Sequence, residues 1–191
     1  MKRICVYCGH SEGHSPEFTT AAKTVGTALA ERGIGLVYGA GGKGMMGAVA
    51  DGAIEGGGEV IGVIPEGIFS REGLHTGVTR LEVTPNMHGR KRMMAELANG
   101  FLALPGGLGT MDELFEIWTW TQLGVHNKPT GILNVNGYYD GLLTFIDVMV
   151  DNGFLQQAIR DAVLVGADVN GLLDQVIAHR PGVHPRWANG D

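Results

Sequence analysis

The stretch FLALPGGLGTMDELFE, residues 101–116, places an apolar run, a glycine-rich turn and a helix start in direct succession. The apolar run, residues 101–105, has the length of a buried strand. The glycines free the backbone, and Thr110 with Glu113 has the T-x-x-E spacing of a helix that begins at Thr110. A strand that passes through a tight turn into a helix is the repeating unit of α/β folds.

The same alternation continues outward along the chain. Short runs rich in Val, Ile and Leu, typical of strands buried on both faces, lie at residues 5–8, 34–39, 59–65, 79–83, 101–105 and 130–135. Helical segments between them open at Ser15, Asn86 and Thr110 and close near Gly33, Gly100 and Gly124. The pattern predicts a doubly wound, Rossmann-like α/β domain with a mostly parallel sheet and helices on both faces.

The C-terminal part of the chain is less regular. From Gly137 it looks mostly helical, with apolar residues at helical spacing between Leu142 and Met149. The last residues combine prolines and glycines without apolar periodicity, so we expect them to be mobile or to pack on a neighbour. We therefore expect one nucleotide-binding domain over residues 1–180 and a C-terminal tail over residues 181–191.

Charge and length exclude several classes of partner. The 191 residues carry a net charge of -6, from 14 basic and 20 acidic side chains, without a run of like charge. Such a chain has no electrostatic footprint for nucleic acid or an anionic membrane. Its N-terminal apolar segment is too short for a signal peptide or a membrane span. We expect a cytoplasmic protein whose partners are small molecules or copies of itself.

The two cysteines, Cys5 and Cys8, lie three residues apart in an expected strand. They should point to opposite faces and are poorly placed for a disulfide. A C-x-x-C redox pair or half of a zinc site is the alternative, but no second pair follows. We favour two buried core thiols and no metal site.

Ligands bind open α/β sheets at the carboxyl ends of the strands. The loop after the second strand, GAGGKGMMG, has glycines in G-x-G-x-x-G spacing at Gly39, Gly41 and Gly44. A dinucleotide site would follow the first strand, and its acidic ribose partner here would be the distant Glu66. We interpret Gly41 and its neighbours as allowing close approach of a ligand, with a merely tight turn as the alternative.

The loop after the fifth strand is the more specific signal. Gly106, Gly107, Gly109 and Thr110 present backbone amides where the partial positive charge of a helix start adds to them. This arrangement favours a phosphate or a carboxylate. The loop lacks the G-K-S/T of a P-loop, so a monophosphate fits better than a triphosphate with magnesium.

The acidic residues of the following helix call for a cation. Glu113 could simply cap its helix, but Glu116 shares the same face, and adjacent carboxylates repel. The segment NMHGRKRMMAE supplies Arg90 and Lys91 at the start of the preceding helix, where cations oppose the helix dipole. A solvated basic face is the ordinary interpretation; the unfavourable position favours an Arg90 that binds the anion or pairs with Glu113.

With PGGLGTMDE at residues 105–113 and MHGRK at residues 87–91, the sequence closely resembles the LOG (LONELY GUY) family. Its members are cytokinin riboside 5'-monophosphate phosphoribohydrolases, long mislabelled as lysine decarboxylases. The resemblance extends to about residue 180 and includes GAGGKGMMG, HNKPTGILNVNGYY and MVDNGFL. One departure is GHS at residues 9–11, where the family often has G-S-S.

The resemblance implies hydrolysis of the N-glycosidic bond of cytokinin riboside 5'-monophosphates, and of AMP, to free base and ribose 5-phosphate without a cofactor. It carries catalytic roles onto Arg90 and Glu113. Phosphate binding falls on Gly106, Gly107, Gly109 and Thr110, and Glu116 matches an acidic position expected to support the ribose. The purine needs an apolar slot, for which Met45, Met46, Met87 and Met94 are the candidates, with an ordinary core position as the alternative for each. Lys91 and Gly41 are further expected substrate contacts.

The expected chemistry agrees with the residue types. Cleavage of an N-riboside builds positive charge at the anomeric carbon, and a carboxylate there stabilises the charge, activates water or attacks directly. A non-catalytic nucleotide carrier of the same fold is the alternative function, since a fold does not fix an activity. A pyridoxal phosphate decarboxylase is the other rival, and it would need a Schiff-base lysine.

The helix after Thr110 is apolar on several sides, at Leu114, Phe115, Ile117, Trp118 and Trp120. Such a helix is buried against something. Packing within a single core is one explanation. A two-fold seam between copies is the other, and the family resemblance also implies it, so we expect a homodimer.

Overall fold

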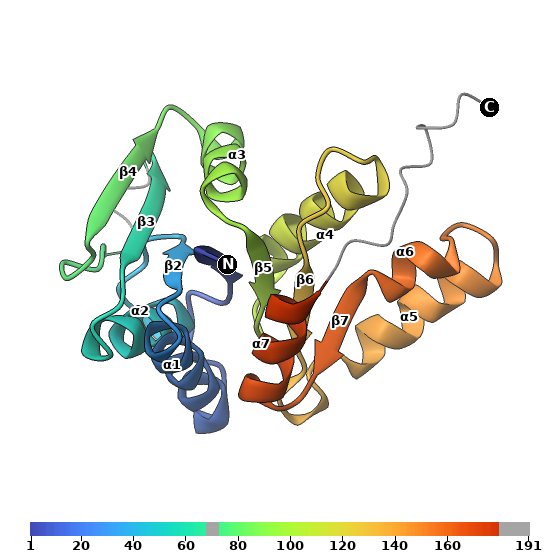
Figure 1. The fold of residues 1–191 in the computed structure, drawn as a ribbon, viewed down its shortest axis with the longest axis horizontal. Coiled ribbons are helices and arrows are strands. Elements are labelled where there is room, and N and C mark those ends of the chain that lie inside the picture. Colours follow the sequence, from blue (N-terminus) through green and yellow to red (C-terminus); the bar gives the residue numbers. More distant parts are fainter. Residues whose placement is uncertain (68–72, 180–191) are drawn as a thin grey trace.

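The structure, a computed structural model, describes residues 1–67 and 73–179 (Figure 1). The expected tail at residues 181–191 lies outside them. The elements are β1 (Arg3–Tyr7), α1 (Pro16–Glu31), β2 (Gly35–Tyr38), α2 (Gly44–Glu55), β3 (Val60–Pro65), β4 (Arg80–Thr84), α3 (Met87–Leu97), β5 (Gly100–Ala103), α4 (Leu108–Gln122), β6 (Thr130–Leu133), η1 (Val135–Gly137), α5 (Asp140–Asp151), α6 (Gln157–Asp161), β7 (Val163–Gly166) and α7 (Val169–Ala178).

The strands form one seven-stranded sheet in the order β4-β3-β2-β1-β5-β6-β7. Every pair of neighbouring strands in the described chain is parallel, and an isolated antiparallel bridge joins Gly41 to Leu74. The strand order runs outward in both directions from β1, which pairs with β2 on one side and β5 on the other. The doubly wound prediction is confirmed, and its switch point lies between β1 and β5.

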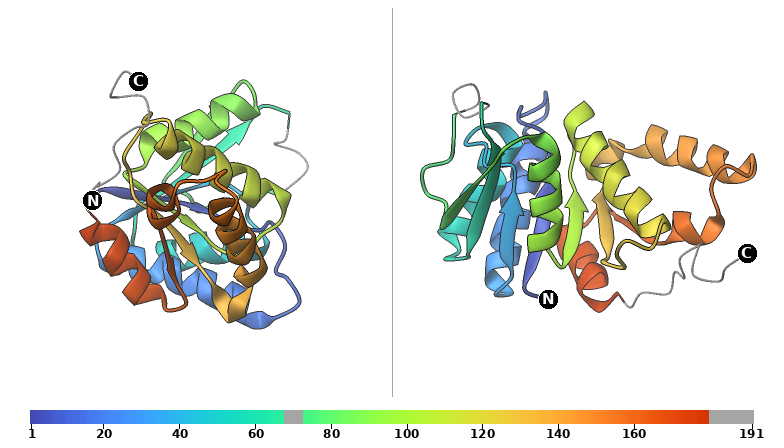
Figure 2. Two further views of the ribbon diagram at one scale, coloured as in Figure 1. Left: turned by 90° about the vertical axis from the view of Figure 1, so that its right-hand side faces the viewer. Right: turned by 90° about the horizontal axis from the view of Figure 1, so that it is seen from above.

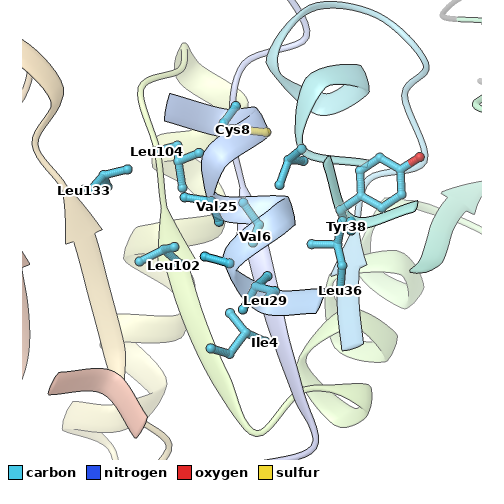
Figure 3. Packing of buried hydrophobic residues seen from close by; sticks show 14 of the residues in the cluster. Ile4, Val6, Cys8, Val25, Leu29, Leu36, Tyr38, Leu102, Leu104 and Leu133 are labelled. Atoms are coloured by element: carbon cyan, nitrogen blue, oxygen red, sulfur yellow. The ribbon is translucent and has the colours of Figure 1, made fainter. Parts of the chain in front are cut away.

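Helices cover both faces of the sheet (Figure 2). Ile4, Val6 and Cys8 pack with α1, α2 and α7 in one cluster of buried residues, part of which Figure 3 shows. Cys5 and Tyr7 pack with α3 and α4 in a second cluster on the other face. This alternation follows from the two-residue period of a strand. The prediction of two free, buried cysteines on opposite faces is confirmed.

Two strands differ from the predictions. The region after Gly137 is mostly helical as predicted, with α5, α6 and α7, but it also contains β7, which was not predicted and which pairs with β6 at the sheet edge. A four-residue apolar run such as VLVG cannot be separated from a helical turn by periodicity. The fourth strand, β4, was expected to be buried on both faces but is an edge strand with mostly exposed or half-buried residues.

Helix starts agree with the sequence except at the decisive turn. Ser15 and Asn86 cap α1 and α3 as predicted, with their side-chain oxygens accepting bonds from the Glu17 and Gly89 amides. The helix expected from Thr110 begins two residues earlier, at Leu108, with no side-chain cap. The alternative in which Glu113 only closes a T-x-x-E capping box is therefore excluded.

The end of the third helix also differs from the prediction. The third helix ends at Leu97, and Gly100, expected to close it, instead opens β5.

No helix in residues 1–67 or 73–179 is both long and apolar enough to cross a membrane.

Candidate active site

A cavity of about 610 Å³ opens at the carboxyl ends of the central strands. Its walls come from the loops after β1, β2 and β5, from the end of β3, and from the starts of α2, α3 and α4. This is the edge at which doubly wound sheets bind ligands. A second groove, of about 550 Å³, lies between α1 and α2 and is lined by no residue of PGGLGTMDE (residues 105–113) or MHGRK (residues 87–91).

Arg90 and Glu113 meet inside the cavity. Arg90 Nη1 lies 2.8 Å from Glu113 Oε1, and the two side chains are only 12% and 10% exposed. Arg90 Nε also donates to the Val63 carbonyl at the end of β3, 3.0 Å away. The hypothesis that Arg90 pairs with Glu113 is confirmed. A solvated basic face describes only Arg92, which pairs with Glu96 on the surface.

The first glycine of GAGGKGMMG makes room for this arginine. A Cβ on Gly39 would lie 2.2 Å from Arg90 Nη2 and 3.0 Å from Met46 Sδ. The close approach expected of this loop is therefore made, at Gly39, by a side chain of the protein itself. Gly41 lies beyond the cavity lining and pairs with Leu74, so its contact with substrate stays a prediction.

The carboxyl of Glu113 has a pKa above its usual value. Burial in the cavity wall is the main cause, because the charged form loses hydration, and the Arg90 guanidinium acts in the opposite direction. A carboxyl with a raised pKa next to a fixed cation is suited to proton transfer and to stabilising positive charge near neutral pH.

The glycine loop is held by its carbonyl oxygens. Three consecutive carbonyls each accept a hydrogen bond from another segment: Leu104 from Tyr139 Oη at 2.6 Å, Pro105 from the Gly9 amide at 3.1 Å, and Gly106 from Tyr138 Oη at 2.7 Å. Within the next residues, the carbonyl of Gly107 accepts from the Met111 amide, 3.1 Å away.

The donors of the same loop are left free. The N–H groups of residues 106–110 have no hydrogen-bond partner in the described part of the chain. The start of α2, also at the cavity, differs, because the Met45 and Met46 amides donate to the Ser11 and Gly9 carbonyls. Compared with the start of α2, the start of α4 is therefore the one equipped to bind an anion.

The other acidic residues of α4 are served by a second cation. Lys91 Nζ lies 3.0 Å from Asp112 Oδ2 and 3.1 Å from Glu116 Oε1. Lys91 and Glu116 lie outside the lining of the cavity, whereas Glu113 lies within it. The structure thus separates the two carboxylates that the helix spacing had grouped, and the expected substrate contacts of Lys91 and Glu116 stay predictions.

The comparisons with known proteins agree on one family. The family model described as "Possible lysine decarboxylase" matches residues 46–176. The cytokinin riboside 5'-monophosphate phosphoribohydrolase LOG7 of Arabidopsis thaliana is 46% identical over 181 residues, which are 95% of this chain and 83% of that protein. The corresponding LOG enzyme of Oryza sativa is 47% identical over 164 residues, 86% and 68% of the two chains. The chain belongs to the LOG family.

The fold of this LOG-family chain recurs in proteins of other function. The molybdenum cofactor carrier protein of Chlamydomonas reinhardtii superposes with a TM-score of 0.70 over 93% of this chain and 99% of that one. The two sequences are 24% identical. At that distance the likeness shows a shared fold alone, and the function has to be argued from the site.

The LOG-family cavity includes residues that the sequence did not single out as contacts. Phe18, Tyr138 and His10 line it. Two sequence signals pointed to two of them: the GHS departure in the first loop, which contains His10, and the NVNGYY segment, which contains Tyr138. Both segments are far from the glycine loop along the chain, so the sequence did not show that they contact it. Met45, Met46 and Met87 line the cavity as expected, whereas Met94 lies in the core behind it.

Among residues 1–67 and 73–179, no group of three or more His, Cys, Asp or Glu side chains could hold a metal ion. The expectation that this LOG-family chain needs neither metal nor cofactor stays a prediction.

Proposed function

We propose that the chain hydrolyses the N-glycosidic bond of cytokinin riboside 5'-monophosphates, and of AMP, to give free base and ribose 5-phosphate. The observation that carries the proposal is the buried Arg90–Glu113 pair in the same cavity as the free amides of residues 106–110. Relatives named as phosphoribohydrolases, 46% and 47% identical, support it.

The 5'-phosphate binds the amides at the start of α4, where the helix dipole adds to the hydrogen bonds. Glu113 lies one turn along the same helix and faces the ribose. As the bond to the base breaks, positive charge develops at the anomeric carbon, and the Glu113 carboxylate stabilises it. Water adds to that carbon, one of its protons goes to the departing base, and Arg90 holds the carboxylate in place.

The apolar part of the cavity binds the base. Met45, Met46, Met87 and Ile64 line its walls. Methionines fill irregular apolar spaces and adapt to their occupants, so this region accepts a purine with or without an apolar N6 substituent. No metal or cofactor takes part in the proposed reaction.

The proposal is tested by incubating the purified protein, without metal, with N6-isopentenyladenosine 5'-monophosphate, AMP and the unphosphorylated riboside. Free base is followed by chromatography. We expect base from the two monophosphates and none from the riboside. Glu113→Gln, which keeps the shape of the side chain but removes its charge, should be inactive.

The same experiment separates the enzyme from a nucleotide carrier. A carrier would bind the monophosphates, which calorimetry measures, and leave all three substrates intact. A buried carboxylate beside the sugar supports the hydrolase, because holding a nucleotide does not require one. Intact substrates together with tight binding would refute the hydrolase.

We also propose a homodimer that works in the cytoplasm without nucleic acid or membrane partners. Half-buried Met111, Phe115 and Trp120 line a surface groove on α4 of about 320 Å³, which supports a seam between copies. Light scattering should give twice the chain mass of 20.2 kDa. Thr119→Arg, in the groove, should yield monomer, whereas Thr144→Arg, exposed on α5, should not. A monomeric wild-type protein would refute the dimer.

A further inference from the structure

Two consecutive tyrosines hold the glycine loop from outside. Tyr139 Oη donates to the Leu104 carbonyl and Tyr138 Oη to the Gly106 carbonyl, on either side of Pro105. Tyr139 is 2% exposed and belongs to the core, whereas Tyr138 is 46% exposed and lines the cavity. The Tyr138 ring also packs edge-on against Phe18, with 5.7 Å between ring centroids. The two hydroxyls thus make the same kind of bond in different surroundings.

The chain turns sharply just before the two tyrosines. Asn136 and Gly137 both have left-handed backbones, with φ of 52° and 71°. The Asn136 side chain donates to Glu17 Oε2 at 2.9 Å, and the Tyr139 amide donates to Asn134 Oδ1 at 2.7 Å. A non-glycine residue in this conformation persists only where its surroundings hold it. The turn therefore fixes the position of the Tyr138 backbone, from which its side chain reaches the glycine loop.

We propose that Tyr138 is a positioning residue for the phosphate-binding loop, an inference that rests on the proposed function. Its hydroxyl fixes the Gly106 carbonyl, and because a peptide group is planar, it also fixes the direction of the Gly107 N–H. With that carbonyl occupied, the loop meets the phosphate with its donors already ordered. The phosphate then binds without the entropy loss of ordering the loop.

The two tyrosines separate positioning from folding. Removing the buried Tyr139 hydroxyl leaves the Leu104 carbonyl without a partner in the core, so Tyr139→Phe lowers the unfolding temperature. Water can replace the half-exposed Tyr138 hydroxyl as donor to Gly106, so Tyr138→Phe folds normally. What Tyr138→Phe loses is the fixed direction of the donor, and therefore affinity for phosphate.

The test measures calorimetric binding of the two halves of the substrate, ribose 5-phosphate and adenine, to wild type, Tyr138→Phe and Phe145→Leu. For Tyr138→Phe we expect the Kd of ribose 5-phosphate to rise about two- to tenfold, the range of one hydrogen bond, and the Kd of adenine to stay unchanged. In turnover of AMP, KM should rise with kcat retained. Phe145→Leu, an exposed position on α5 outside the cavity lining, is the control and should bind ribose 5-phosphate as wild type does.

The other possible results each contradict one claim: the positioning role of Tyr138, the phosphate site or the hydrolase activity. An unchanged Kd of ribose 5-phosphate in Tyr138→Phe, or equal changes for both probes, overturns the positioning role and leaves the hydrolase intact. If wild type does not bind ribose 5-phosphate, the phosphate site falls, and the inference with it. Selective loss of ribose 5-phosphate binding in a protein that cleaves no AMP supports Tyr138 and refutes the hydrolase.

Discussion

At the scale of single residues, the Arg90 guanidinium is shared between two partners. One nitrogen holds Glu113 at 2.8 Å and another holds the Val63 carbonyl at 3.0 Å. A planar fork fixed at two points cannot follow a moving carboxylate, so we expect Glu113 to keep its position through the proposed reaction. Neither Lys, with a single nitrogen, nor a solvated Arg would give this geometry.

The pH dependence of activity should report the raised pKa of Glu113. In the proposed mechanism the ionised Glu113 carboxylate is required, so kcat/KM should fall as the pH drops through a pKa higher than that of an ordinary glutamate. The effect on stability has the opposite sign. A raised pKa means that the folded state favours the protonated carboxyl of Glu113, so the stabilising contribution of this group is present at low pH and lost as the pH rises through the raised pKa. Profiles of kcat/KM and of urea unfolding against pH check both.

One control is needed for this profile, because the substrate phosphate itself titrates near pH ~6. Binding of ribose 5-phosphate to Glu113→Gln, followed over the same pH range, gives the phosphate titration alone. An acid limb in the ordinary range of glutamate, after this correction, would contradict the raised pKa.

Gly39→Ala should disable the enzyme without unfolding it. The new methyl group would lie 2.2 Å from Arg90 Nη2, so the guanidinium has to leave Glu113. A misplacement of about 1 Å at a reacting group can lower turnover about a hundredfold. The measurement is kcat with circular dichroism as a check of folding. Gly141→Ala, on α5 with open space around it, should keep full activity. Normal kcat in Gly39→Ala would refute the role of the glycine.

At the scale of elements, two cations join α3 to α4. Arg90 pairs with Glu113 at the cavity, and the neighbouring Lys91 pairs with Asp112 and Glu116 away from it. Because the second contact fixes how α4 lies against α3, the position of Glu113 depends on both. Lys91 therefore stabilises the arrangement without lining the cavity.

Lys91→Met should lower the free energy of unfolding by about 1–3 kcal/mol. The Lys91 side chain is 10% exposed, and the substitution leaves Glu116 without its cation in a half-buried position. Urea denaturation measures the loss. Arg92→Met is the matched control from the same helix, because its pair with Glu96 is exposed and should contribute less than about 0.5 kcal/mol. Equal losses of unfolding free energy in the two variants would contradict the stabilising role of Lys91 between α3 and α4.

The sequence predicted the site better than the sheet edges. Arg90 stood out because a cation at a helix start opposes the dipole, and only a partner such as Glu113 compensates for it. The strand β7 stayed hidden, because four apolar residues carry too little periodicity. The contact of Tyr138 with Gly106 spans 32 residues, and local patterns hold no information on such a pair.

At the scale of the whole molecule, labelling of Cys5 should follow global unfolding. Cys5 is fully buried in the central strand, and burial raises the pKa of its thiol, so little reactive thiolate forms in the folded protein. In Cys8→Ala, which leaves one thiol, the labelling rate in increasing urea should match the unfolding curve at one protein concentration. Labelling well below the transition would mean that the sheet opens locally.

The central place of β1 also has a consequence for synthesis on the ribosome. Among the described strands, β1, Arg3–Tyr7, is made before the others and pairs with β2 soon afterwards, but its other edge waits for β5, Gly100–Ala103. Until then the nascent chain carries an unpaired, apolar strand edge, which is the kind of surface that chaperones cover and that joins chains into aggregates. The loop that follows β5 contacts Gly9, so the cavity forms in the same step that closes this edge.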